Sequence, residues 1–321
     1  MAKIAVLTSG GDAPGMNATI RAIVRSGIYA GHEIYGIERG FEGLLNRQIK
    51  RMDSRCVSDI IQRGGTILKT ARSEEFNTPE GVRKAAEILK AFKIDALVVI
   101  GGDGSFRGAK DLVNLENFNC LGIPCTIDND LSYTDYTIGF DTATNTVVSA
   151  INSIRDTMTS HDRACIIEVM GRKCGDIALY SGIASGAESI LVPELPFDIK
   201  AITNKMRTNQ IKGKVSDIIV LAEGVCGCGE LKAMIQEEID IVIRTVKLGY
   251  IQRGGSPTMA DRVLGARLAE RAIALFNNGF TGGRCVGIKN GKIIDLSIDE
   301  VLNAPSKFNK ELYDIATKLS F

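Results

Sequence analysis

Short runs rich in Val, Ile and Leu alternate along the chain with segments whose apolar residues recur every three or four positions. In the first half, the runs predict strands at Lys3–Leu7 and Asp95–Ile100, because a short continuous apolar run suits a strand buried in a parallel sheet. The helical repeat predicts helices at about 17–30 and 80–92. A glycine-rich turn follows each of these two strands.

The same alternation starts again after Asp141. It predicts helices at about 142–158, 230–245 and 258–277 and strands at 164–170, 217–222 and 284–288. Strands that alternate with helices are typical of α/β layers with parallel sheets, so we expect an α/β fold made of two related halves. In such sheets ligands bind beyond the carboxyl ends of the strands, which directs attention to the glycine-rich turns.

Length and charge agree with a globular protein of two domains. The 321 residues exceed what one typical core organises. The 39 Lys and Arg residues nearly balance the 38 Asp and Glu residues, so the formal net charge is +1. This balance creates no global field that would recruit nucleic acid or an acidic membrane, and any anion site must therefore be local.

The N-terminal sequence and the cysteines predict a cytoplasmic protein. The apolar run Ile4–Leu7 is far too short for the core of a signal peptide, and no apolar run approaches the roughly 18 residues that a membrane helix needs. The 8 cysteines are scattered, and several lie in strand-like runs, so we expect reduced, structural thiols. Cys226 and Cys228 resemble half of a metal site, but partners at zinc-site spacing are missing.

Two glycine-rich turns are candidates for phosphate binding. Gly10–Gly15 joins a predicted strand to a helix, where backbone N–H groups and the helix dipole can bind an anion. Gly101–Ser105 adds Asp103, which can hold Mg²⁺ directly or through water. Neither turn matches the dinucleotide or P-loop fingerprint. A tight turn without a ligand is the alternative for the first, and a helix cap by Asp103 or Ser105 for the second.

Two carboxylates, Asp128 and Asp130, follow a further predicted strand. Their spacing puts both on one side of an extended segment. One can accept a hydroxyl proton while the other orients the substrate or handles a metal, and an Asx-type turn is the alternative. Arginines bind phosphate bidentately and stay charged. Five of them stand near strand ends or glycine-rich turns: Arg72, Arg163, Arg172, Arg244 and Arg253.

Five motifs, taken together, resemble those of the bacterial ATP-dependent 6-phosphofructokinases. They occur in the family's order over essentially the whole chain, at Thr8–Asn17, Gly101–Ser105, Thr126–Asp130, Glu168–Arg172 and Gln252–Pro257. The resemblance implies transfer of the ATP γ-phosphoryl group to the 1-hydroxyl of fructose 6-phosphate, a step of glycolysis. It also implies a homo-oligomer, usually a tetramer with active sites shared between subunits.

The resemblance further implies two Rossmann-like, three-layer α/β/α domains with largely parallel sheets. The ATP-binding domain would comprise residues 1–138 and about 251–301. The sugar-phosphate-binding domain would comprise residues 139–250 and about 302–321.

The resemblance also assigns roles to the matching residues. Asp128 would be the general base on the sugar hydroxyl, with Thr126 beside it. Arg72 and Arg172 would stabilise charge on the transferring phosphoryl group. The ATP site would be lined by Gly11, Arg72, Gly102, Asp103, Gly104, Ser105 and Gly108, and Asp103 would hold Mg²⁺. The remaining sugar-phosphate contacts would be Asp130, Arg163, Met170, Gly171, Glu223, Arg244, Tyr250 and Arg253. Of these, Arg163 and Arg244 would come from a neighbouring subunit.

Two positions that distinguish phosphoryl donors in the family favour ATP. Pyrophosphate users typically carry a second Asp and a Lys where this chain has Gly104 and Cys125. Gly104 leaves room for the nucleotide α-phosphate, and Cys125 supplies no charge. A pyrophosphate-dependent enzyme is one alternative. A regulatory, non-catalytic paralogue that binds sugar phosphate is another, against which the retained acids and arginines argue.

The chain departs from the family at Tyr250, where relatives usually carry a histidine that touches the 6-phosphate. A tyrosine hydroxyl can donate one hydrogen bond but cannot become cationic near neutral pH, so we expect weaker binding of fructose 6-phosphate. Six residues match an effector site for ADP or phosphoenolpyruvate: Arg21, Arg25, Arg155, Glu188, Lys212 and Lys214. A solvated basic helix face is the alternative for Arg21 and Arg25, which lie four residues apart.

Overall fold

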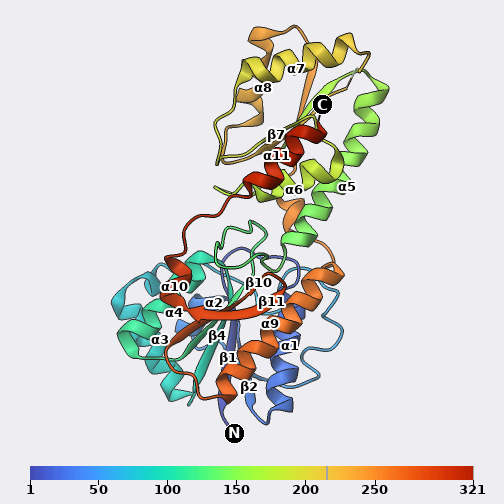
Figure 1. The fold of residues 1–321 in the computed structure, drawn as a ribbon. Helices are drawn as coiled ribbons and strands as arrows, with labels where there is room; N and C mark the ends of the chain where they lie inside the picture. The colour runs from blue at the N-terminus through green and yellow to red at the C-terminus, as the bar shows by residue number, and fades with distance from the viewer. Residues whose placement is uncertain (215, 321) are drawn as a thin grey trace. The chain divides into compact units, whose positions relative to one another are not determined.

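The computed structural model describes residues 1–214 and 216–320. The chain divides into two compact units, which are described separately (Figure 1). The first unit comprises Met1–Ile127, Leu131–Thr142 and Arg253–Ser306, and the second comprises Asp128–Asp130, Ala143–Gln252 and Lys307–Phe321. Residues 215 and 321, which belong to the predicted sugar-phosphate-binding domain, lie outside the described residues. That these units are the ATP-binding and sugar-phosphate-binding domains stays a prediction.

The first unit is built on a seven-stranded sheet in the order β11-β10-β5-β4-β1-β2-β3. The pairs among β10, β5, β4, β1 and β2 are parallel, whereas the edge strands β11 and β3 pair antiparallel to their neighbours. The strands are β1 (Lys3–Thr8), β2 (Glu33–Ile37), β3 (Ile49–Met52), β4 (Ala96–Gly101), β5 (Cys120–Pro124), β10 (Gly283–Lys289) and β11 (Lys292–Ser297).

Helices lie against this sheet because both of its faces are apolar. Successive strand residues point to opposite faces. Ala5 and Leu7 of β1 belong to a core shared with α2, α3 and α4, and the equally buried Ile4 and Val6 face the other side, where α1 and α9 pack together (Figure 1). The helices are α1 (Met16–Tyr29), α2 (Gly40–Leu45), η1 (Glu75–Asn77), α3 (Pro79–Ala91), α4 (Asp103–Glu116), α9 (Met259–Asn277) and α10 (Ile298–Leu302).

The second unit contains a four-stranded, fully parallel sheet in the order β7-β8-β6-β9. Its strands are β6 (Ala164–Val169), β7 (Ser189–Leu191), β8 (Ile218–Ala222) and β9 (Ile243–Lys247). Ile166 and Ile219 pack against α7 and α8 on one face, and α6 contacts β7 and β8 and packs against α11. The helices are α5 (Phe140–Ser160), which begins in the first unit, α6 (Asp176–Ser185), α7 (Ile199–Ile211), α8 (Cys228–Glu238), η2 (Gly249–Arg253) and α11 (Lys310–Leu319).

The prediction of a single helix over 230–245 is wrong. α8 ends at Glu238, its C-cap residue Ile239 is extended at φ −149° and ψ 134°, and Ile243–Lys247 forms β9 beside β6. The segment is rich in β-branched residues, which favour a strand once a neighbouring strand is available for pairing. The other predicted helices and strands match the structure within two residues at each end, and the α/β fold with mostly parallel sheets is confirmed.

Candidate active site

Three turns of the first unit meet at one edge of its sheet. They follow β1, β4 and β5, which are neighbours, and the carboxyl ends of parallel strands lie at the same edge. The Ser9 N–H donates to the carbonyl oxygen of Ile100 at 3.0 Å, and the Cys125 N–H donates to that of Gly101 at 2.9 Å. A Cβ on Gly102 would lie 3.7 Å from the Thr126 Cβ. The predicted nucleotide turns and Thr126 are therefore brought together.

Arg253 adds a positive charge to the first of these turns. Its Nη1 donates to the carbonyl oxygen of Asp12 at 3.3 Å, and a Cβ on Gly11 would collide with the same guanidinium nitrogen. Glycine at position 11 thus lets the guanidinium lie against the backbone, and a side chain there would displace it. The resemblance to the family predicts contact of Arg253 with the sugar 6-phosphate and gives no sign of this contact with the first turn.

The first turn of α4 combines an acidic side chain with open backbone. Asp103 begins the helix and has a side chain that is 41% exposed, and Arg107 donates to its two carboxylate oxygens at 2.8 Å and 3.2 Å. This pair explains the raised pKa of Arg107. Next to it, a Cβ on Gly104 would meet no atom within 4 Å. Neither packing nor a left-handed backbone requires glycine there, so the space is available to a ligand.

Asp103 fits a magnesium ion that is bound mainly by phosphate. Within residues 1–214 and 216–320, no group of three or more His, Cys, Asp or Glu side chains is arranged to hold a metal. Mg²⁺ is commonly bound by one or two carboxylates together with substrate phosphates and water, and does not need a cage of protein ligands. An accessible carboxylate at the start of a helix, beside glycine-rich turns, meets that requirement.

The remaining predicted nucleotide residues have different surroundings. Ser105 is buried, and Gly10, Gly101 and Ser105 pack together. A Cβ on Gly108 would lie 3.0 Å from the rings of both Phe41 and Phe76, which stack with centroids 4.0 Å apart. Gly108 is therefore needed for packing. Arg72 is exposed in the loop before η1.

Cys125 is buried directly after β5, and burial raises the pKa of its thiol well above the ordinary value. The thiol therefore stays neutral near pH 7.

In the second unit, a buried carboxylate faces an exposed arginine. Asp128 is 1% exposed, and its Oδ2 lies 3.3 Å from Nε of Arg172. The next residue, Asn129, takes a left-handed conformation at φ 54° and donates to Asp176 at 2.8 Å, which anchors the segment to the start of α6. Burial raises the pKa of Asp176. A carboxylate beside a guanidinium suits proton acceptance next to developing phosphoryl charge.

The turn after β6 presents Arg172 in a constrained conformation. Gly171 has φ 137° and Arg172 has φ 55°; the first value is accessible to glycine and the second is uncommon for arginine. The Arg172 N–H donates to Oε1 of Glu223 at 2.9 Å. A Cβ on Gly224 would collide with the Arg172 carbonyl oxygen. Glu223, assigned above to the sugar, therefore also holds this turn.

Arg163 and Arg244 lie at the amino ends of the strands of this sheet, whereas Met170 and Glu223 follow the carboxyl ends. Arg163 immediately precedes β6, and Arg244 is the second residue of β9. Because β6 and β9 are parallel, both arginines are at the amino ends of their strands. Tyr250 lies beyond the carboxyl end of β9, in η2, and is 83% exposed. The two arginines are therefore not brought together with the other sugar-phosphate residues of the same unit.

The predicted effector residues fall into two groups. In the second unit, Arg155 Nη1 lies 3.5 Å from Oε1 of the buried Glu188, and Lys214 pairs with the same oxygen. The Ile218 N–H donates to the other carboxylate oxygen at 2.5 Å. Lys212 is exposed at the end of α7. Arg21 and Arg25 lie on α1 of the first unit, and Arg25 is the more exposed of the two.

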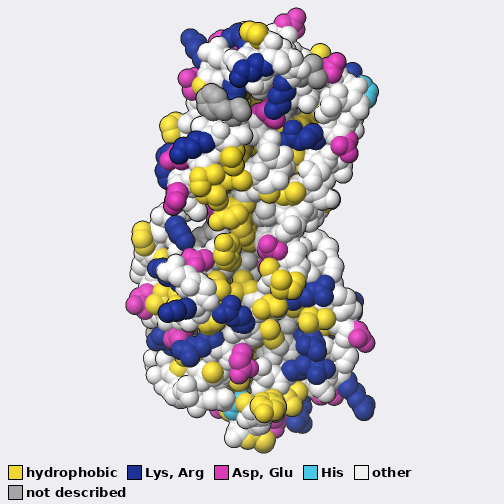
Figure 2. Space-filling model, turned by 45° about the vertical axis from the view of Figure 1, so that its right-hand side comes forward, with side chains coloured by type: hydrophobic (Ala, Val, Ile, Leu, Met, Phe, Trp, Pro, Cys, Tyr) yellow, Lys and Arg dark blue, Asp and Glu magenta, His cyan; other side chains and the backbone are white. Residues whose placement is uncertain are grey.

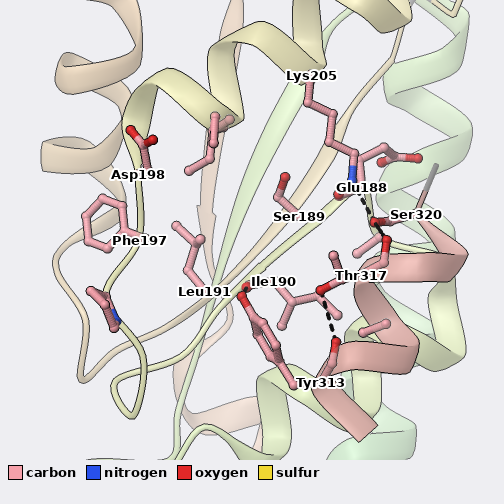
Figure 3. A pocket seen from close by; sticks show the side chains of 15 residues that line it. Glu188, Ser189, Ile190, Leu191, Phe197, Asp198, Lys205, Tyr313, Thr317 and Ser320 are labelled. Atoms are coloured by element: carbon pink, nitrogen blue, oxygen red, sulfur yellow. Dashed lines mark hydrogen bonds between the residues drawn. The ribbon is translucent and has the colours of Figure 1, made fainter. Parts of the chain in front are cut away.

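A pocket of about 230 Å³ lies between β7, α7 and α11 of the second unit. Figure 3 shows its wall: Tyr313 lies on α11, Ser320 directly follows that helix, and Lys205 reaches from α7. The Lys205 Nζ donates to the Glu188 carbonyl oxygen at 2.5 Å and to Ser320 Oγ at 2.6 Å, and burial lowers the pKa of its ammonium group. No motif of the sequence indicates this pocket, because its residues come from three separate segments.

Charged side chains of both signs are distributed over the surface. On the face drawn in Figure 2, Lys and Arg side chains lie among Asp and Glu side chains on both units. Among the helices of the described residues, none is long and apolar enough to cross a membrane.

Comparison with known proteins agrees with this geometry. The phosphofructokinase family model matches residues 3–276. An ATP-dependent 6-phosphofructokinase of Clostridium botulinum is 59% identical over 320 residues, and one of Clostridium tetani is 56% identical over 321 residues; each match covers 100% of both chains. The solved phosphofructokinase of Saccharomyces cerevisiae has a TM-score of 0.89 at 35% identity, with 99% of this chain covered. This chain spans 47% of the yeast chain. The chain belongs to the phosphofructokinase family.

Proposed function

We infer that the chain catalyses ATP-dependent phosphorylation of fructose 6-phosphate at its 1-hydroxyl, giving fructose 1,6-bisphosphate and ADP in glycolysis. The observation that carries this inference is the buried Asp128 carboxylate with Arg172 Nε at 3.3 Å. Phosphoryl transfer needs a positioned proton acceptor and fixed positive charge more than covalent help. The full-length clostridial relatives that bear this activity in their names support the same conclusion.

The placement of these side chains and the resemblance to the family support the following residue roles. Asp128 accepts the proton of the 1-hydroxyl, and Thr126 lies beside the attacking group. Arg172 and Arg72 stabilise negative charge on the phosphoryl group in transfer. Asp130, Met170, Gly171 and Glu223 contact the sugar, and Tyr250 and Arg253 contact its 6-phosphate.

ATP lies over the turns and the first residues of α4 that contain Gly11, Gly102, Gly104 and Ser105, since backbone N–H groups at such turns and helix N-termini bind phosphate. Gly108, further along α4, borders this site. Asp103 would hold Mg²⁺, which would neutralise charge on the nucleotide phosphates. Arg107, which pairs with Asp103, must then share or release that carboxylate.

We further propose that the enzyme is a homo-oligomer organised as in the family, because Arg163 and Arg244 of one chain lie away from the other proposed sugar-phosphate residues of the same unit. Arg163 and Arg244 lie at the amino ends of β6 and β9, whereas the sugar residues follow the carboxyl ends of β6 and β8. A neighbouring subunit would supply the two arginines, and the family's tetramer provides such a contact.

An effector site and a cytoplasmic location complete the proposal. Arg155 and Lys214 surround the buried Glu188 and form a charged cluster that suits an anionic ligand with a metal, such as ADP, or phosphoenolpyruvate. Lys212 lies next to this cluster in sequence, and Arg21 and Arg25 would come from a neighbouring subunit. The activity belongs to glycolysis, which places the enzyme in the cytoplasm.

A coupled assay with ATP or pyrophosphate as the donor, on the wild type and on Asp128→Ser, tests the function. We expect turnover with ATP, little with pyrophosphate, and a loss of about 10²–10⁴-fold in kcat for the variant, the range typical of a general base. Turnover with pyrophosphate alone would replace the proposed donor. Absence of turnover with either donor would indicate a non-catalytic binding protein. ATP-dependent activity that survives in Asp128→Ser would remove the proposed base.

A further inference from the structure

A fully buried glutamine joins two of the turns that carry proposed substrate residues. Gln252 is 0% exposed. Its Oε1 accepts a hydrogen bond from the Met170 N–H at 3.1 Å, and its Nε2 donates to the Gly249 carbonyl oxygen at 2.9 Å. Met170 directly follows β6 and Gly249 begins η2. One amide group therefore links the end of β6 to the turn that presents Tyr250.

The turn after β6 is held from both neighbouring strands. β6 lies between β8 and β9. From the β8 side, Glu223 accepts the Arg172 N–H at 2.9 Å. From the β9 side, Gln252 accepts the Met170 N–H. The intervening Gly171 and Arg172 both have positive φ, a conformation that persists only where the surroundings hold it.

We propose that Gln252 is a positioning residue for the phosphoryl transfer: its amide sets the distance between the Met170–Arg172 turn and the η2 turn. The proposal rests on the function proposed above. The amide is needed because it is an acceptor and a donor at once, and a buried N–H or C=O without a partner is costly. An apolar side chain would leave both backbone groups without their bonds, and the two turns could then shift relative to each other.

Gln252→Met tests this role, because methionine is of similar length and apolar. We expect kcat/KM for fructose 6-phosphate to fall by about 10- to 100-fold, since small displacements of reacting groups have effects of this size. The loss should be divided between a lower kcat and a higher KM. The KM for ATP should stay within about twofold, because the proposed ATP turns have their own backbone contacts in the first unit.

Thr203→Val is the matched control. Thr203 is buried on α7 and donates from Oγ1 to the Lys200 carbonyl oxygen at 3.3 Å, so this variant also loses a buried side chain–backbone hydrogen bond in the second unit. We expect a lower melting temperature and unchanged kinetic constants. If Gln252→Met folds and keeps its fructose 6-phosphate constants within about twofold of the wild type, Gln252 is only structural and the proposal is wrong.

Gln252→Glu tests the positioning role of Gln252 even if Gln252→Met does not fold. The ionised side chain keeps the acceptor for Met170 N–H but turns an oxygen toward the Gly249 carbonyl, whereas the protonated acid can donate there as the amide does. Other titratable groups on the same elements are identical in the two proteins: Glu168, Glu223, Arg172 and Lys247. Comparing the variant with the wild type at each pH therefore cancels their contribution. The kcat/KM of the variant divided by that of the wild type should be lower at pH 8 than at pH 6.5. A variant equal to the wild type at pH 8 would overturn the proposal.

The failure of this proposal and the failure of the proposed function give different results. If the wild type itself does not phosphorylate fructose 6-phosphate, the function is wrong whatever the variants do. If the wild type is active and the Gln252 variants match it, the function stands and only the positioning role is lost.

Discussion

Gly104→Asp should make the protein more stable while it impairs the use of ATP. A Cβ at this position would meet no protein atom within 4 Å, and Gly104 is the second residue of α4. Replacing a helical glycine removes an entropic cost, and an acidic group in the first turn is favoured by the helix dipole. Together these effects amount to about 0.5–1 kcal/mol, or a rise of about 1–3 °C in melting temperature.

The expected effect on ATP binding is unfavourable, and its free energy is larger than the gain in stability. If the nucleotide α-phosphate lies about 5 Å from the new carboxylate, Coulomb repulsion at an effective dielectric constant of 20–30 is about 2–3 kcal/mol. This corresponds to an increase of about 30- to 150-fold in the KM for ATP. The KM for fructose 6-phosphate should change little. Initial rates in an ADP-coupled assay and a thermal melt of the same preparation measure the two effects.

Gly229→Asp provides the matched control. Gly229 is also the second residue of a helix, α8, and its Cβ would also meet no atom within 4 Å, but no ligand is proposed there. It should show the gain in melting temperature without a change in the KM for ATP. An unchanged KM for ATP in a folded Gly104→Asp protein would show that the nucleotide does not lie at this turn. Loss of stability at Gly104 alone would show that the glycine is needed for packing.

Three other changes have outcomes that follow from single contacts. Tyr250→His should lower the KM for fructose 6-phosphate without affecting the melting temperature, because the tyrosine is 83% exposed; an unchanged KM would refute the role given to this position. Burial alone would raise the pKa of Glu168, but hydrogen bonds from Lys247 and from the Cys228 N–H outweigh it and lower the pKa below 4.5. The ionised Glu168 therefore stabilises the folded protein above pH 4.5, and this stabilisation is lost as the pH falls further. Lys247→Met should lower the melting temperature at pH 7, and the decrease should become smaller as the pH falls below 4.5. Asp261 accepts hydrogen bonds from the N–H groups of Gly139 and Thr142 at 2.8 Å and 2.9 Å. Asp261→Ala should therefore lower the free energy of unfolding, measured by urea denaturation, by about 2–4 kcal/mol. A loss below 1 kcal/mol would contradict this.

Sequence periodicity predicted the elements well where a strand is continuously apolar. Ala96–Gly101 is buried on both faces, so its pattern and its environment agree. The sequence did not predict β9, because Arg244, Thr245 and Lys247 of this edge strand are exposed. Polar residues in these positions are equally typical of the exposed face of a longer helix. Only the pairing with β6 decides between the two structures, and that pairing is not local in sequence.

Backbone turns were predicted better than side-chain partners. Gly101–Ser105 and Thr126 could be placed together because adjacent parallel strands end at one edge. The position of Arg253 against Gly11 could not, because a long, flexible side chain can reach several turns from the same backbone position. Gln252 opens one of the five motifs but received no role of its own, because a single amide has no periodicity or spacing that distinguishes a buried glutamine from one on the surface.

If Arg163 and Arg244 bind the 6-phosphate as proposed, their placement leaves the sugar-phosphate site of a single chain incomplete. Met170 is seven positions after Arg163 along an extended strand, a distance of about 23 Å at the rise of a parallel strand. No arginine side chain bridges that gap, and β6 cannot shorten because β8 and β9 pair along it. In the proposed site, charge for the 6-phosphate must therefore come from residues other than Arg163 and Arg244 of the same chain, or from another copy of the chain. If another copy supplies these arginines, as proposed, substrate binding and subunit association are linked, and the rigid parallel sheet is the physical reason.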